Sequence, residues 1–152
     1  MFDIRIDDLS GEPTRRLVAL HLAGMHAATP SEYAFALDIS GLQSPDLTFW
    51  TAWDGDEVVG MAALKDLGGG AAELKSMRTD PEHLRRGVAA ALLEHVIAEA
   101  RRRRLERLSL ETGVGGGFEP ALTLYRRRGF QDGEPFADYQ PSPFNQFLHL
   151  EL

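Results

Sequence analysis

A strand, a basic turn and a helix meet in residues 79–93, which read TDPEHLRRGVAAALL. The alternation over residues 71–79 predicts the strand, and apolar residues at helical spacing predict a helix over residues 86–103. Between them the turn carries two arginines followed by Gly87. Because the first turn of a helix has unpaired N–H groups and the positive end of the helix dipole, this arrangement favours a bound anion such as a phosphate.

Over the whole chain, the predicted strands and helices follow the order β-α-α-β-β-β-α-β-α-β-β. Strands come both in hairpins and around helical crossovers, so the order predicts a mixed α/β (α+β) sheet with helices on its faces. Neither a linker nor a repeat interrupts the pattern, and residues 1–152 are expected to form a single domain. Strands are predicted over residues 2–6, 47–54, 57–64, 71–79, 107–112, around Phe130 and over 146–152, and helices over 13–25, 31–42 (with Ser31 as its cap), 86–103 and 120–128.

Composition excludes several classes of protein. The chain is 43% hydrophobic and 26% charged, close to globular averages, so collagen-like and disordered classes are excluded. It has no cysteine, which excludes disulfides, thiolate metal sites and a cysteine nucleophile. The net charge of −7 argues against nucleic-acid binding. Neither a signal peptide, a membrane-length apolar run nor a metal-ligand motif is visible, so we expect a cytoplasmic protein without membrane or metal binding.

Two short motifs stand on either side of the predicted strand 107–112. Residues 84–89 read LRRGVA between a strand and a helix, and residues 121–130 read ALTLYRRRGF. They resemble motif A, Q/R-x-x-G-x-G/A, and motif B, A-x-x-L-Y-x-x-x-G-F, of the GNAT superfamily of acetyl-CoA-dependent N-acetyltransferases. The chain also resembles a bacterial subgroup of small, uncharacterised GNAT proteins. The resemblance implies a GNAT-like, mostly antiparallel sheet of about seven strands with about four helices, and acetyl-CoA as the cosubstrate.

The resemblance also implies which residues bind the cofactor. In the family two neighbouring strands splay apart and the pantetheine arm inserts between them, here against the backbone of Met77 and Thr79, with the Met77 N–H donating to the thioester carbonyl. Leu84 departs from the usual Arg or Gln, and Phe118 stands where an Asn is common. An arginine of the turn is expected to compensate for Leu84. The full expected set is Met77, Arg78, Thr79, Leu84, Arg85, Arg86, Gly87, Val88, Ala89, Ala90, Phe118, Pro120, Leu124 and Tyr125.

Acetyl transfer to an amine needs a base for the amine and an acid for the leaving thiolate. Tyr125 in motif B is the expected acid, because a phenol can protonate a thiolate. Glu73 is the first candidate for the base, acting directly or through water, and Glu111 is the second. Because successive side chains of a strand point to opposite faces, Glu73 and Lys75 are expected on the same strand face as Met77. Direct attack in a ternary complex follows, since an acetyl-cysteine intermediate is impossible.

The acceptor is the least specified part of the sequence. The resemblance places it between the first two helices and the loop before the last strand, with Glu32, Tyr33 and Tyr139 as candidate substrate-binding residues. A small-molecule primary amine is the leading acceptor. The alternatives are a protein lysine or N-terminus, or a CoA-binding regulatory module without turnover; a homodimer is also open. Residues 78–128 carry 11 basic and 7 acidic side chains, whereas both flanks are acidic, which predicts a cationic acceptor.

Overall fold

A single sheet organises the computed structural model, which describes residues 2–30 and 35–152. Within these residues the sheet has seven strands in the order β1-β2-β3-β4-β5-β7-β6. Every neighbouring pair is antiparallel except β4 and β5, which are parallel. The mostly antiparallel sheet expected from the sequence is therefore confirmed. The strands are β1 (Asp3–Ile6), β2 (Leu47–Asp54), β3 (Glu57–Gly68), β4 (Ala71–Thr79), β5 (Arg107–Gly113), β6 (Gln131–Asp132) and β7 (Asn145–Glu151).

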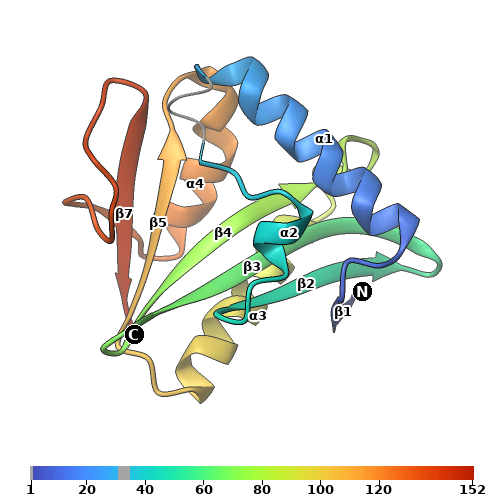
Figure 1. Ribbon diagram of the computed structural model, residues 1–152, viewed down its shortest axis with the longest axis horizontal. Coiled ribbons are helices and arrows are strands. Elements are labelled where there is room, and N and C mark those ends of the chain that lie inside the picture. The colour runs from blue at the N-terminus through green and yellow to red at the C-terminus, as the bar shows by residue number, and fades with distance from the viewer. Residues whose placement is uncertain (1, 31–34) are drawn as a thin grey trace.

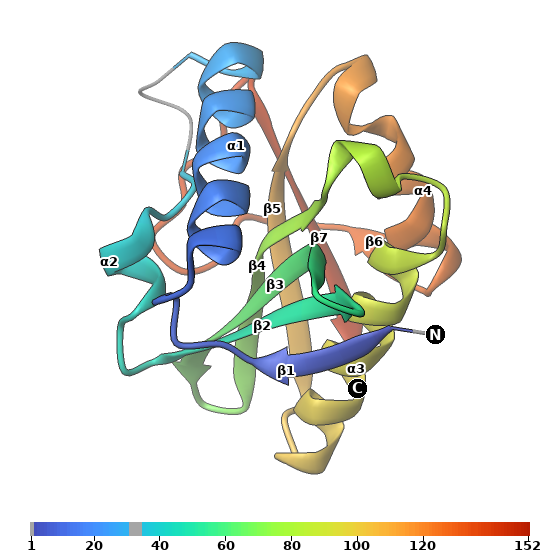
Figure 2. The same ribbon diagram turned by 90° about the vertical axis from the view of Figure 1, so that its right-hand side faces the viewer.

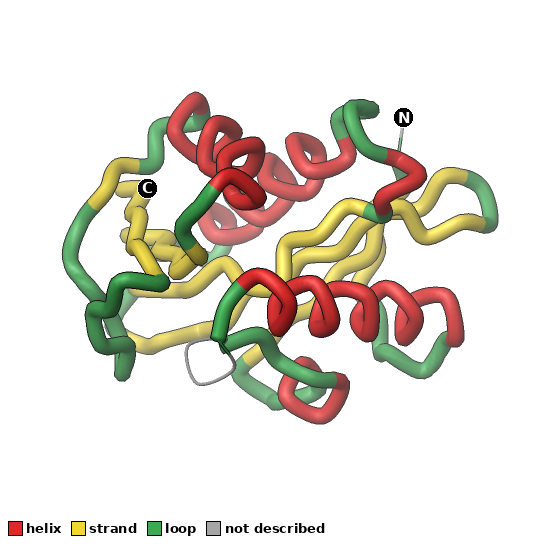
Figure 3. Tube along the Cα trace, turned by 90° about the horizontal axis from the view of Figure 1, so that it is seen from above, coloured by secondary structure: helices red, strands yellow, loops and turns green. Residues whose placement is uncertain are grey.

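Helices cover both faces of the sheet, as Figures 2 and 3 show from two directions. One face carries α1 (Glu12–Ala28) and the short α2 (Ile39–Leu42). The other carries α3 (Val88–Arg102) and α4 (Glu119–Arg127), each preceded by a 3₁₀ turn, at Pro81–His83 and Gly116–Phe118. In the part of the chain that the structure describes, no helix combines the length and the apolar character needed to cross a membrane.

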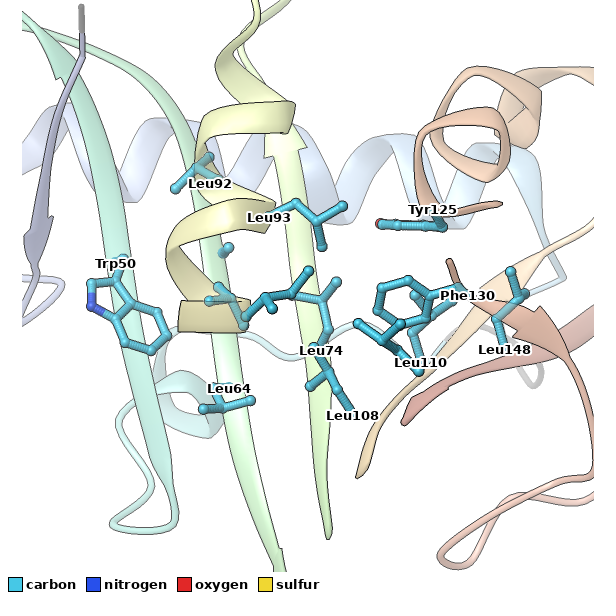
Figure 4. Packing of buried hydrophobic residues seen from close by; sticks show 14 of the residues in the cluster. Trp50, Leu64, Leu74, Leu92, Leu93, Leu108, Leu110, Tyr125, Phe130 and Leu148 are labelled. Atoms are coloured by element: carbon cyan, nitrogen blue, oxygen red, sulfur yellow. The ribbon is translucent and has the colours of Figure 1, made fainter. Parts of the chain in front are cut away.

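Each face of the sheet has its own hydrophobic core. On the α3 and α4 side, Leu92 and Leu93 pack with Leu74 of β4 (Figure 4). On the α1 side, Leu17 packs in a separate cluster with Met61 of β3. Burial of each such side chain stabilises the fold by about 1.5–3 kcal/mol, and residues 58–64 of β3 are apolar on both faces because both faces are covered.

The predicted helix over residues 31–42 is wrong at its described N-terminal part. Helix α2 begins only at Ile39, and residues 35–38 are not helical. The Asp38 carboxylate accepts a hydrogen bond from the Gly41 N–H at 2.9 Å, so Asp38 caps the helix. Ser31, the expected cap, lies outside the described residues.

The strand expected around Phe130 is short, because β6 has only two residues and begins after Phe130. Phe130 itself is buried against Tyr125, with ring centroids 5.7 Å apart.

A bulge in β4 corrects the predicted strand face. Ser76 has a φ of +55°, and the pairing with β3 shifts register at this point. Lys75 pairs with Ala63 and therefore lies on the α1 face with Glu73, whereas Met77 packs in the α3 core. The expectation that Glu73 and Lys75 share a face with Met77 is wrong, because the extra residue restarts the alternation.

Close packing of α3 on β3 depends on Gly60. A Cβ atom at this position would lie 2.6 Å from Val88 Cγ1 and 2.9 Å from Leu92 Cδ1. We expect Gly60→Ala to lower the free energy of unfolding by about 1–3 kcal/mol, because the helix must shift away from the sheet. Gly117→Ala is the control, since a Cβ there meets open space. Equal unfolding free energies for the two variants in urea titrations would contradict this packing.

Candidate active site

Strands β4 and β5 pair over three positions and then separate. Their partners are Ala71 with Arg107, Ala72 with Leu108 and Glu73 with Ser109. Beyond this point β4 continues beside β3 and β5 continues beside β7, so the two strands diverge (Figure 1). Backbone groups along the opening lack a neighbouring strand, and an extended, amide-bearing group can pair with them. The splay expected from the sequence is therefore present.

A cavity of about 170 Å³ occupies this opening and reaches residues on both faces of the sheet. The α4 side contributes Tyr125 and Phe118, and the α1 side contributes His21 and Arg78. A group entering along the α4 face can therefore meet a second molecule entering along the α1 face. The lining residues are His21, Met25, Phe35, Ala36, Glu73, Leu74, Lys75, Ser76, Met77, Arg78, Leu110, Glu111, Thr112, Gly117, Phe118, Ala121 and Tyr125.

Tyr125 combines burial with an unused hydroxyl group. Its side chain projects from α4 into the core beside β4, and only 6% of it is exposed (Figure 4). Desolvation raises the pKa of the phenol above its ordinary value, so the group stays protonated at neutral pH. Among the described residues the hydroxyl has no hydrogen-bond partner, and Tyr125 lines the cavity. A protonated donor is thus present at the opening.

The basic turn (residues 84–87) leaves the start of α3 free for an anion. Gly87 is the N-cap residue with a φ of +84°, and no side chain caps the helix. A Cβ at Gly87 would meet open space, so the turn is accessible as well as uncapped. Leu84 is 58% exposed and contributes no charge. These features fit a pyrophosphate bound to the first N–H groups of α3.

The two arginines of the basic turn have different roles. Arg86 donates hydrogen bonds of 2.6 Å to Asp54 on the β2–β3 hairpin and to His83. Arg85 is exposed and forms no ion pair in the described part of the chain. The compensation expected for Leu84 is therefore available from Arg85, whereas Arg86 fastens the turn to the sheet.

Phe118 places an aromatic ring at the position where the motif commonly has an Asn side chain. Its ring lies against Gly113, where a Cβ atom would overlap it. Pro120 stands in the first turn of α4, and Leu124 is partly buried against the α3 core. The Phe118 ring therefore shapes one wall of the cavity and offers no hydrogen bond to a cofactor arm.

Glu73 is locked in a buried cluster. Its side chain is 4% exposed and accepts hydrogen bonds from Lys75 Nζ at 3.1 Å and from the Tyr139 hydroxyl at 2.5 Å. Lys75 Nζ also lies 2.7 Å from the Tyr139 oxygen. Tyr139 makes an edge contact with Phe35, with centroids 5.3 Å apart, which places the loop before β7 over this cluster. Glu73 is thus held as the anionic partner of Lys75.

Glu111 has the properties of a base that works near neutrality. Burial raises the pKa of its carboxyl to about 7. The negative charge of Glu73 raises this pKa further, whereas Lys75 and a hydrogen bond from Asn145 oppose the shift. Glu111 lines the cavity from β5, the strand opposite Glu73.

The structure places the other acceptor candidates unevenly. Glu32 and Tyr33 lie outside the described residues. Tyr139 contacts Glu73 and Lys75 rather than lining the cavity. Sequence reasoning missed His21, which lines the cavity from α1; no local signal could have identified it, because only the packing of α1 on the sheet brings it there.

Comparisons with known proteins agree with this architecture. The profile of the Acetyltransferase (GNAT) family matches residues 15–130. The uncharacterised N-acetyltransferase YsnE of Bacillus subtilis is 50% identical over 149 residues, covering 98% of this chain and 99% of its own. The uncharacterised N-acetyltransferase YedL of Escherichia coli is 48% identical over 152 residues, covering 100% and 96%. The chain therefore belongs to the GNAT family: it is an N-acetyltransferase that uses acetyl-CoA.

Solved structures support the same fold. A Klebsiella pneumoniae protein assigned to the acyl-CoA N-acyltransferases is 29% identical, with a TM-score of 0.84 and coverage of 100% of this chain and 98% of that one. A Bacillus subtilis acetyltransferase in complex with CoA is 19% identical, with a TM-score of 0.75 and coverage of 100% and 99%. The second likeness concerns the fold alone.

The different roles of the two arginines predict different effects on cofactor binding. We expect Arg85→Gln to weaken CoA binding about threefold to tenfold, and to do so less at high salt, because an exposed cation near a phosphate is lost. Arg86→Gln should lower the unfolding free energy more than it lowers CoA affinity. Calorimetric titration of CoA measures the first effect, with the exposed Arg101→Gln on α3 as control. An unchanged affinity in Arg85→Gln would rule out its phosphate contact.

Proposed function

We propose that this enzyme acetylates a primary amine of a small molecule, by direct attack on acetyl-CoA in a ternary complex. The observation that carries the proposal is the cavity in the β4–β5 opening, which joins Tyr125 on the α4 side to Glu111 on the α1 side. Its volume of about 170 Å³ suits a small acceptor.

The proposed chemistry assigns one proton transfer to each side of the cavity. Acetyl-CoA supplies the activated thioester. Glu111 takes a proton from the acceptor ammonium, since its pKa of about 7 leaves a substantial fraction ionised at neutral pH. The Met77 N–H stabilises the negative charge that develops on the thioester oxygen. Tyr125 then donates its phenolic proton to the thiolate as the C–S bond breaks, which releases CoA, and the phenolate takes up the second proton lost by the new amide nitrogen, directly or through water.

This assignment reverses the order of the two candidate bases. Glu73 has little access to solvent and already carries two hydrogen bonds, one of them to a cation. Removing its charge would leave Lys75 buried without its partner. We therefore propose that Glu73 holds Lys75 and Tyr139 in place, while Glu111 acts as the base, directly or through water.

The remaining expectations from the sequence stay predictions. A protein acceptor and a regulatory module without turnover are less well supported, because the cavity is small and an unpaired phenol lies at it. The single domain over residues 1–152, the cytoplasmic location and the homodimer also belong to the proposal.

Replacement of Tyr125 tests the acid. We expect Tyr125→Phe to lower kcat about 10²-fold or more, because the thiolate leaves unprotonated. The variant keeps the ring that packs on Phe130 and removes a hydroxyl without a described partner, so thermal unfolding should change little. Thiol release from acetyl-CoA measures kcat. Undiminished turnover from pH 6 to 9 would show that another group protonates the thiolate.

The pH dependence distinguishes Glu111 from Glu73. In the wild type, kcat/KM for the acceptor should rise with pH through a midpoint near 7, as Glu111 loses its proton. Glu111→Gln should abolish this midpoint, so that kcat/KM depends on pH only through the ionisation of the acceptor amine. Glu73→Gln should retain a midpoint but move it to lower pH, because the negative charge that raises the pKa of Glu111 is lost. If the midpoint instead disappears in Glu73→Gln and survives in Glu111→Gln, Glu73 is the base.

Stability provides the control for this comparison. The folded protein disfavours ionised Glu111, so this residue lowers the free energy of unfolding as the pH rises from about 4.5 to above 7. We expect Glu111→Gln to be at least as stable as the wild type at pH 8. Its loss of activity would then have a chemical origin.

A further inference from the structure

Three buried polar atoms without partners gather at one place in the molecule. Among the described residues, three side-chain N or O atoms have no contact with solvent and no hydrogen bond: His21 Nδ1, Ser76 Oγ and Arg78 Nε. All three residues line the cavity between β4 and β5. Buried polar groups in native proteins nearly always have partners, and a cluster of exceptions at one cavity indicates a polar ligand.

Arg78 is the charged member of this group. The bulge at Ser76 directs it to the α1 face, where its Nη2 donates a long hydrogen bond of 3.4 Å to the Leu20 carbonyl. A Cβ atom at Gly24 would overlap the guanidinium, so α1 has a glycine where Arg78 passes. Arg78 forms no ion pair with any residue in the described ranges. Its charge is therefore half-buried and uncompensated by protein.

The other charges at the cavity do not neutralise Arg78. Glu73 is already paired with Lys75, at 3.1 Å. Glu111 is partly protonated at neutral pH, because burial raises its pKa to about 7. His21 is neutral, since burial and the nearby Arg78 lower its pKa to about 4. The acceptor side of the cavity therefore has a surplus of positive charge until Glu111 ionises.

We propose that the acceptor is an amine that also bears a carboxylate, such as an amino acid, and that Arg78 binds this carboxylate while its amine faces Glu111. The guanidinium of Arg78 is partly exposed and lines the cavity, where a carboxylate can accept its hydrogen bonds, and the Ser76 hydroxyl is a second donor in the same lining. Arg78 on β4 and Glu111 on β5 line the same cavity from the two strands, so each can face one of the two charges of such a zwitterion. The inference rests on the proposed acetylation of a small amine.

This acceptor differs from the cationic one that the charge division along the sequence predicts. The acidic flanks contribute to the surface of the whole chain, but the acids at the cavity are either paired with Lys75 or close to their pKa. A dication would meet Arg78 without an opposing anion. A zwitterion places one charge on each side of the opening.

Matched acceptors test the inference. Phenylalanine, leucine and alanine are each compared with their primary amides and with their decarboxylated amines, and thiol release gives kcat/KM; the protein has no cysteine to contribute background. At least one free acid should exceed its amide at least tenfold. Arg78→Gln should reduce this ratio to near one, chiefly through KM for the acceptor, and Arg78→Lys should restore part of it. Arg101→Gln, on the exposed end of α3, should keep the wild-type ratio.

Several outcomes would overturn the inference. Amides and decarboxylated amines used as well as the acids would remove the need for a carboxylate site. An acid-to-amide ratio of kcat/KM that is unchanged in Arg78→Gln would show that another residue binds the carboxylate. A raised KM for acetyl-CoA in Arg78→Gln, with an unchanged acceptor KM, would assign Arg78 to the cofactor.

A binding measurement separates failure of this inference from failure of the proposed function. If no amine in the panel releases thiol, acetylation of these small amines is refuted. Titration of the CoA-loaded protein with N-acetylphenylalanine and with its amide still tests Arg78. Binding of the acid at least tenfold tighter than the amide, lost in Arg78→Gln, supports the carboxylate site. Equal binding of the two overturns it.

Discussion

The end of pairing between β4 and β5 after Glu73 and Ser109 is the constraint on which the rest of the site depends. A parallel pair held together along its whole length would leave no unpaired backbone and no passage through the sheet. Each diverging strand keeps a partner on its outer side, β3 for β4 and β7 for β5. The cores on the two faces hold the diverging strands, so the opening is part of the rigid architecture.

Electrostatics then divide the opening into parts. On one side the helix start at Gly87 and the exposed Arg85 favour phosphate, and the net charge of −7 does not prevent this because the positive groups are local. On the other side, Glu73 is paired with Lys75 at 3.1 Å, and burial raises the pKa of Glu111 to about 7. In the proposed chemistry, these different surroundings give the two carboxyls different roles.

The sequence predicted the features that depend on neighbouring residues. The basic turn, the start of α3 within two residues and Tyr125 in its motif all follow from local patterns, and the family follows from two motifs at their spacing. The bulge at Ser76 was not predictable, because nothing in KSMRT marks the left-handed residue. Nor was the capture of Arg86 by Asp54, 32 positions away, or the lock of Tyr139 on Glu73, 66 positions away. Such contacts depend on how the elements pack, which periodicity does not report.

The bulge at Ser76 also has a consequence for how enzymes of this shape diversify. Because it restarts the alternation of β4, Lys75 and Arg78 face α1 while Leu74 and Met77 face α3. In the proposed chemistry, acceptor binding and cofactor binding therefore use opposite faces of one strand. Substitutions on the α1 face can then change which acceptor is acetylated, while the face that binds CoA keeps its side chains. New acceptor specificities can therefore arise without changes at the cofactor site.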